Sequence, residues 1–85
     1  MQEFQYTIQD ENGIHARPAG LLVRKAQSYQ SSATMIHEGK SADMKRLFAL
    51  LGLNIKQGNT VTVQLSGEDE EAAAQGLKEF FGENL

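Results

Sequence analysis

The sequence predicts a two-layer α+β domain in which helices cover one face of a four-stranded sheet and the other face is polar. Two segments, residues 3–9 and 60–65, alternate strictly between polar and apolar side chains, which is typical of half-buried strands. Two others, residues 16–27 and 70–81, repeat apolar residues every three or four positions, as amphipathic helices do. With 85 residues, the chain has room for a single domain spanning 1–85.

The first strand and the first helix are separated by a four-residue loop. In residues 3–9 the alternation places Phe4, Tyr6 and Ile8 on one face, and residues 10–13 are loop formers. The inward face of the helix is expected to consist of Ala19, Leu22, Val23 and Ala26.

The start of this helix has two interpretations. The apolar pattern allows a start near residue 16. Proline, however, favours the first helical position and keeps the residue before it out of the helical region, which would begin the helix at Pro18. His15 lies beside the helix amino terminus in either case.

The middle of the chain predicts a hairpin and a short helix. Residues 31–37 form a strand with Ala33 and Met35 on one face, Glu38-Gly39 is a two-residue turn, and residues 40–43 return. Residues 44–51 are predicted to be helical and to stop at Gly52.

The last strand and helix complete the domain. Residues 60–65 direct Val61, Val63 and Leu65 inward, and Asp69 is the expected N-cap of the final helix. Its apolar stripe is Ala73, Ala74, Leu77, Phe80 and Phe81. The order of elements also suits a ferredoxin-like module, because periodicity does not determine which strands are neighbours.

Composition excludes several classes of protein. Eight Lys and Arg against 11 Asp and Glu give a net charge of −3, which argues against a protein that wraps nucleic acid. The absence of Cys excludes a disulfide framework, and His15 and His37 lack metal-ligand spacing, so neither a metal nor a cofactor is expected. There is no membrane-length apolar run and no signal-peptide pattern. We therefore expect a cytoplasmic protein that does not insert into membranes.

The segment Gly13-Ile14-His15-Ala16-Arg17-Pro18-Ala19 concentrates groups that suit an anion. A helix amino terminus exposes unpaired N–H groups and carries about half a positive charge. Arg17 adds a forked cation, and His15 adds an imidazole that is able to attack phosphorus. Two interpretations stay open from the residues alone: a phosphate site, or a surface histidine beside an ordinary helix start.

The same seven residues resemble the phosphorylation-site signature of the HPr family, the histidine-containing phosphocarriers of the bacterial phosphoenolpyruvate-dependent sugar phosphotransferase system. The resemblance extends along the chain through the Gly39-Lys40 hairpin, Met44-Lys45, Gly58 and Gly67-Glu68-Asp69-Glu70. It implies an open-faced β-sandwich, with four antiparallel strands and three helices on one face.

The resemblance also implies the roles of residues. His15 would accept a phosphoryl group on Nδ1 from phosphorylated enzyme I and pass it to sugar-specific IIA proteins, while Arg17 and the amides of Ala16 and Arg17 hold the phosphoryl oxygens. Such a protein is a relay, not an enzyme, and is expected to be a monomer. The partner surface would combine cations with apolar side chains: Leu21, Arg24, Lys45, Arg46, Leu47, Phe48 and Leu51.

Two residues depart from the family pattern. Arg46 replaces a serine that is phosphorylated in many relatives, so regulation through that serine is not expected. Asn54 stands where glycine is frequent, and asparagine is among the residues best able to adopt a positive φ. Two alternative functions remain: a regulatory, nitrogen-related phosphocarrier with the same histidine chemistry, or a binding module without covalent chemistry. An RNA-binding ferredoxin-like domain is disfavoured by the acidic balance.

Overall fold

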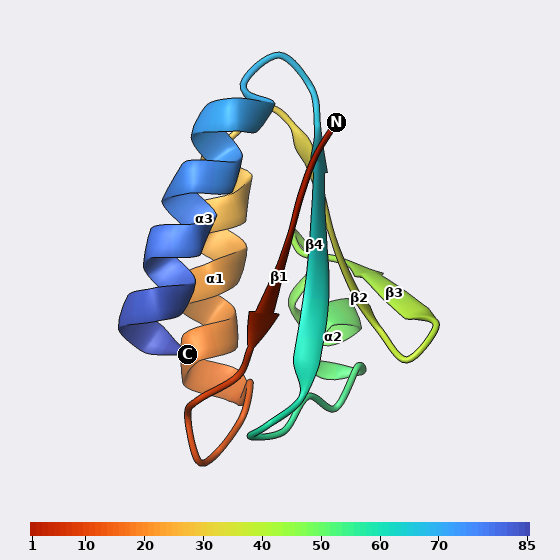
Figure 1. Ribbon diagram of the computed structural model, residues 1–85, viewed down its shortest axis with the longest axis vertical. Helices are drawn as coiled ribbons and strands as arrows, with labels where there is room; N and C mark the ends of the chain where they lie inside the picture. The colour runs from red at the N-terminus through yellow and green to blue at the C-terminus, as the bar shows by residue number, and fades with distance from the viewer.

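The computed structural model describes all 85 residues and has the predicted order of elements. The strands are β1 (Gln2–Thr7), β2 (Ser32–His37), β3 (Lys40–Asp43) and β4 (Thr60–Ser66), and the helices are α1 (Ala16–Gln27), α2 (Leu47–Leu51) and α3 (Glu70–Asn84). Every strand pair is antiparallel, and the order across the sheet is β1-β4-β2-β3. Figure 1 shows α1 and α3 side by side on one face of the sheet. The predicted α+β open-faced sandwich is therefore confirmed.

The two faces of the sheet follow from the alternation in the sequence. Val61, Val63 and Leu65 are buried, and Val63 lies opposite both Phe4 and Met35 across the strand pairs. The outer face is held by polar contacts, including the hydroxyl pair Thr7–Thr60 at 2.8 Å and the bond from the Gln64 amide to Glu3 at 3.0 Å. Because only one face is apolar, the helices must all pack on that side.

Phe81 is the fully buried centre of the packing between α3 and β1. Its ring meets those of Phe4 and Tyr6 edge to face, with centroids 5.6 and 5.3 Å apart. An edge-to-face aromatic pair contributes about 0.5–1.5 kcal/mol beyond the burial of its area. This cluster fixes α3 against the sheet, and so determines where the carboxyl end of α3 lies.

The tight turns lie at the positions that the sequence predicts. Glu38 and Gly39 both have positive φ, 49° and 79°, as the two central residues of a type I′ hairpin turn require. Asn54 has φ 55°, so the expectation that asparagine would tolerate this conformation is confirmed.

Several element boundaries differ from the sequence prediction by one to three residues. β1 ends at Thr7 because Thr60, its partner, is the first residue of β4. α1 begins at Ala16, as the apolar pattern allowed, so the alternative start at Pro18 is wrong and Pro18 is the third helical residue. α2 begins only at Leu47, because the Asp43 carboxylate and carbonyl oxygens accept the N–H groups of Lys45 and Arg46 in a turn.

The prediction of Asp69 as N-cap is confirmed in position but not in its side-chain contact. Asp69 precedes α3, yet its carboxylate makes no cap hydrogen bond. It accepts instead the N–H groups of Gln30 and Ser31 and the Ser31 hydroxyl, at 2.9, 2.9 and 2.5 Å. The residue therefore ties the start of α3 to the segment between α1 and β2.

Candidate functional site

His15 is the N-cap of α1, and its side chain is free. Its backbone is extended, with φ −105° and ψ −178°, and its carbonyl accepts the N–H of Ala19. The imidazole is exposed and makes no cap hydrogen bond. The imidazole is therefore accessible from solvent at the start of the helix.

The loop before His15 is locked to the turn that follows α2. Gly13 is buried with φ +66°, and a Cβ atom there would collide with the carbonyl oxygen of Ile55. That carbonyl accepts the N–H of Ile14 at 3.1 Å. Only glycine suits this close approach of two backbones, which fixes the direction in which the chain enters α1.

The first turn of α1 offers two free donors. The N–H groups of Ala16 and Arg17 form no hydrogen bond within the chain, and Pro18 has no N–H. Arg17 is exposed, and its guanidinium forms no ion pair. The structure thus brings together the predicted His15, Ala16 and Arg17 with their donors unoccupied, an arrangement that suits a bound anion.

A shallow pocket of about 270 Å³ contains the histidine. Its walls are Asp10, His15, Arg17, Pro18, Leu21 and Asn84. Asp10 and Asn84 were missed in the sequence: Asn84 reaches the pocket only because α3 ends there, and Asp10 could be suspected only from its closeness in sequence to His15. The N–H groups of Gln9 and Asp10 donate to the carbonyl of Leu85, which holds the end of α3 beside this loop.

The predicted partner surface is partly assembled by α1 and α2. Arg17, Leu21 and Arg24 lie at i, i+4 and i+7 on α1, all exposed. On α2, Phe48 is 84% exposed, and Leu47 and Leu51 are half-buried against the core. Leu50 is fully buried.

The two predicted cations before α2 differ in their surroundings. Arg46 is the exposed N-cap of α2, whereas the Nζ of Lys45 donates to the carbonyl of Tyr29 at 3.0 Å, beyond the carboxyl end of α1. The carbonyl of Lys45 in turn accepts the side-chain amide of Gln27. Lys45 therefore also connects α1 to the segment that leads into α2.

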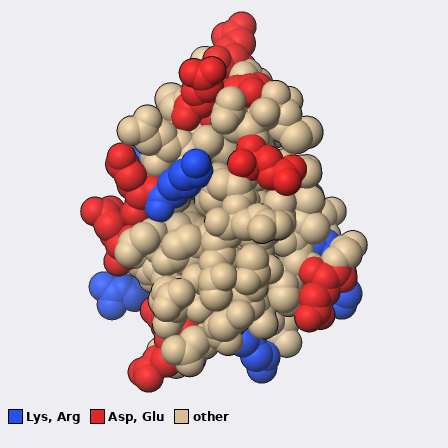
Figure 2. All heavy atoms as spheres, in the orientation of Figure 1, with Lys and Arg blue, Asp and Glu red and all other residues tan.

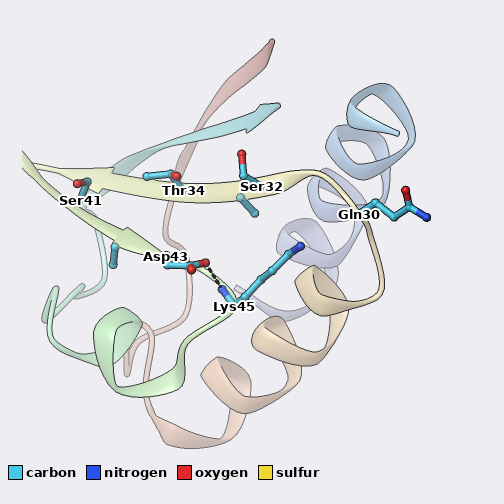
Figure 3. Close-up of a pocket in the computed structure, with 8 residues that line it drawn as sticks. Gln30, Ser32, Thr34, Ser41, Asp43 and Lys45 are labelled. Atoms are coloured by element: carbon cyan, nitrogen blue, oxygen red, sulfur yellow. Dashed lines mark hydrogen bonds between the residues drawn. The ribbon is translucent and has the colours of Figure 1, made fainter. Parts of the chain in front are cut away.

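A second hollow, of about 430 Å³, shares no residue with the histidine pocket. Figure 3 shows its hydroxyl groups along β2 and β3, with Lys45 extending across it toward the segment that contains Gln30.

No group of three or more acidic or histidine side chains lies close enough together to hold a metal ion. No helix combines the length and apolar character needed to cross a membrane.

The sequence and fold match known proteins along nearly the whole chain. Residues 2–83 match the family described as "PTS HPr component phosphorylation site". The chain is 42% identical over 77 residues to phosphocarrier protein HPr of Lysinibacillus sphaericus, covering 91% of this chain and 88% of that protein.

Solved structures agree with the sequence match. A Mycoplasma histidine-containing phosphocarrier protein superimposes with a TM-score of 0.90 at 33% identity, covering 93% of this chain and 90% of that one. HPr of Thermoanaerobacter tengcongensis gives 0.89 at 34% identity over the full length of both chains. The chain described here therefore belongs to the HPr family of phosphocarriers of the phosphotransferase system.

Proposed function

We propose that this protein relays a phosphoryl group by accepting it on Nδ1 of His15 from phosphorylated enzyme I and passing it to sugar-specific IIA proteins. The observation that carries the proposal is the exposed, unbonded imidazole of His15 beside the free N–H groups of Ala16 and Arg17. Membership of the HPr family supports the carrier role.

Each transfer exchanges one bond to phosphorus for another. The lone pair of His15 Nδ1 forms the N–P bond while the bond from phosphorus to the donor group of enzyme I breaks, and that electron pair leaves with the donor. The two amides and the Arg17 guanidinium then face the phosphoryl oxygens and stabilise their charge. The second transfer reverses these steps onto the acceptor.

Exposure of His15 is a requirement of the relay and not an accident of its position. Donor and acceptor must each approach the imidazole in line, so the histidine cannot lie in a closed pocket. A site that held the phosphoryl group too firmly would block its release to the second partner. The shallow pocket and its few donors are consistent with moderate retention.

We assign partner docking to the exposed apolar side chains of Leu21 and Phe48, flanked by Arg17, Arg24 and Arg46. Leu47, Leu51 and Lys45 would support this surface from its base, because they are half-buried. Cations around an apolar centre suit acidic partners and would raise the rate of encounter.

Arg46 removes one form of regulation from this carrier. The side chain has no hydroxyl to phosphorylate, and it places a permanent cation at the N-cap of α2. We therefore propose a relay without serine phosphorylation at this position. We also propose that it acts in the cytoplasm. It would be a monomer, since the exposed large apolar side chains are confined to Met1, Leu21 and Phe48.

The test is phosphorylation with phosphoenolpyruvate and enzyme I from the same source. One acid-labile, base-stable phosphate per chain is expected, absent in His15→Ala and retained in His37→Ala, whose histidine lies at the end of β2. No incorporation into the wild-type chain, with an enzyme I that phosphorylates itself, would contradict the proposal.

A further inference from the structure

One side-chain carboxylate lines the pocket that contains His15. Of its six wall residues, Arg17 is the permanent cation and Asp10 is the only acid; the remaining walls are Pro18, Leu21 and Asn84. Asp10 therefore faces the same small volume in which a group attached to His15 would lie. Glu11, the next residue, is exposed and does not line the pocket.

Three hydrogen bonds fix Asp10 in this position. Its N–H donates to the carbonyl of Leu85 at 2.9 Å, its carbonyl accepts the N–H of Gly13 at 2.9 Å, and its Oδ1 accepts the N–H of Asn12 at 2.8 Å. The carboxylate forms no ion pair with Arg17 or with any other cation. Its negative charge is therefore held at the pocket and left without a side-chain counter-ion.

We propose that Asp10 limits how firmly His15 retains its phosphoryl group, an inference that rests on the relay function proposed above. The incoming group carries about −1.5 to −2 charges at neutral pH. Arg17 and the two amides attract that charge, whereas the Asp10 carboxylate repels it across the pocket. The opposing charges keep the phosphorylated state from becoming so stable that release is prevented.

The inference predicts opposite effects on the two transfers. Removing the charge of Asp10 stabilises phosphorylated His15, which raises the equilibrium constant for uptake from enzyme I and lowers the one for delivery to a IIA protein. The carrier cancels from the overall reaction, so the product of the two constants must stay unchanged. For charges within one partly exposed pocket, each constant should change by about three- to tenfold.

The experiment measures both equilibrium constants for the wild-type chain, Asp10→Asn and Glu11→Gln. Asparagine keeps the oxygen that accepts the Asn12 N–H, and thermal unfolding of each variant checks that the loop still folds. Asp10→Ser is a second variant in case the asparagine amide disturbs the loop, because the shorter serine side chain is uncharged and still carries an oxygen that can accept a hydrogen bond. Glu11→Gln removes the same charge one residue away and should leave both constants within twofold of the wild-type values.

Added salt separates an electrostatic role from a structural one. The difference between Asp10→Asn and the wild-type chain should shrink as ionic strength rises toward 1 M, where the screening length is about 3 Å. The inference would be overturned if folded Asp10→Asn and Asp10→Ser gave the same two equilibrium constants as the wild-type chain. It would also be overturned if the constants changed by an amount that did not depend on salt. Failure of the wild-type chain to take up phosphate would instead overturn the proposed function on which the inference depends.

Discussion

At the scale of residues, the site depends on groups that the rest of the fold does not use. His15 caps α1 through its backbone while its ring stays free, and the Arg17 side chain has no ion-pair partner. Lys45 is the contrast, because its ammonium is bound to the carbonyl of Tyr29. Free polar groups at the helix start can respond to an incoming charge without first breaking bonds inside the protein.

Arg17→Ala should therefore slow phosphoryl transfer and leave the fold intact. Loss of one donor to a developing charge slows comparable reactions on the order of 100-fold. Rapid-quench measurement of phosphoryl uptake from enzyme I gives the rate, and thermal unfolding gives the stability. The matched control is Lys40→Ala, which removes an exposed cation at the β2–β3 hairpin and should transfer at the wild-type rate. If Arg17→Ala unfolded the domain, the role of Arg17 would be structural.

At the scale of elements, the sequence predicted which side chains face the core better than it predicted where each strand or helix begins and ends. Alternation identified Val61, Val63 and Leu65 as inward, because burial repeats with the period of the strand. Helix ends depend on local competition instead: Asp43 captures the N–H groups of Lys45 and Arg46 and delays α2 to Leu47. The contacts of Asp69 join residues 38 or 39 positions apart, and nothing in a local pattern indicates them.

The link between Asp69 and the α1–β2 segment predicts a dependence of stability on pH. Bonds from the Ser31 hydroxyl and the Gln30 N–H lower the pKa of Asp69 below its ordinary value of 3.8. A carboxyl whose pKa is lower in the folded state stabilises the fold above the unfolded pKa, and that contribution disappears as pH falls through the folded pKa. The stabilisation should therefore be complete at neutral pH and be lost below about pH 4.

Thermal unfolding of Asp69→Asn tests this expectation. The variant should melt at a lower temperature than the wild-type chain at pH 7, and the difference should narrow as the pH falls below 4, where protonation removes the charge from the wild-type carboxyl as well. Glu68→Gln removes an exposed neighbouring charge and serves as the control. A difference in melting temperature that is constant across this range of pH would contradict the assignment.

At the scale of the whole molecule, the net charge conceals its distribution. Figure 2 shows acidic side chains at the top and around the left and lower right edges of one face, a few separated cations, and a broad central area without charge. None of the eight Lys and Arg side chains forms an ion pair with an acid. The total of −3 argues against a nucleic-acid partner, but the placement of cations around α1 and α2 could be inferred only from the family resemblance and the fold. The order of strands in the sheet could likewise not be predicted from periodicity, because alternation shows which side chains share a face but not which strands are neighbours.

Substitutions at Phe48 and Leu50 should separate effects on partner binding from effects on stability. The two residues lie two positions apart on α2, but Phe48 is exposed and Leu50 is buried. Phe48→Ala should weaken binding to enzyme I and IIA proteins by about tenfold, with little change in melting temperature, since its ring is 84% exposed. Leu50→Ala should destabilise the fold by about 2–5 kcal/mol, since its side chain is fully buried. Titration calorimetry and urea unfolding measure the two effects, and unchanged affinity in folded Phe48→Ala would remove it from the partner surface.

The hydrogen bonds from Gln9 and Asp10 to the carbonyl of Leu85 determine how the protein is best immobilised for partner measurements. They hold the end of α3 next to the histidine pocket, whereas Met1 lies at the other end of the sheet, where its amino group pairs with Glu70 (Figure 1). A linker or affinity tag joined after Leu85 would emerge beside Asn84, at the pocket to which the proposed partners must gain access. Attachment through the β2–β3 hairpin avoids the pocket, and because the chain contains no cysteine, a Glu38→Cys substitution would provide one unique thiol for coupling.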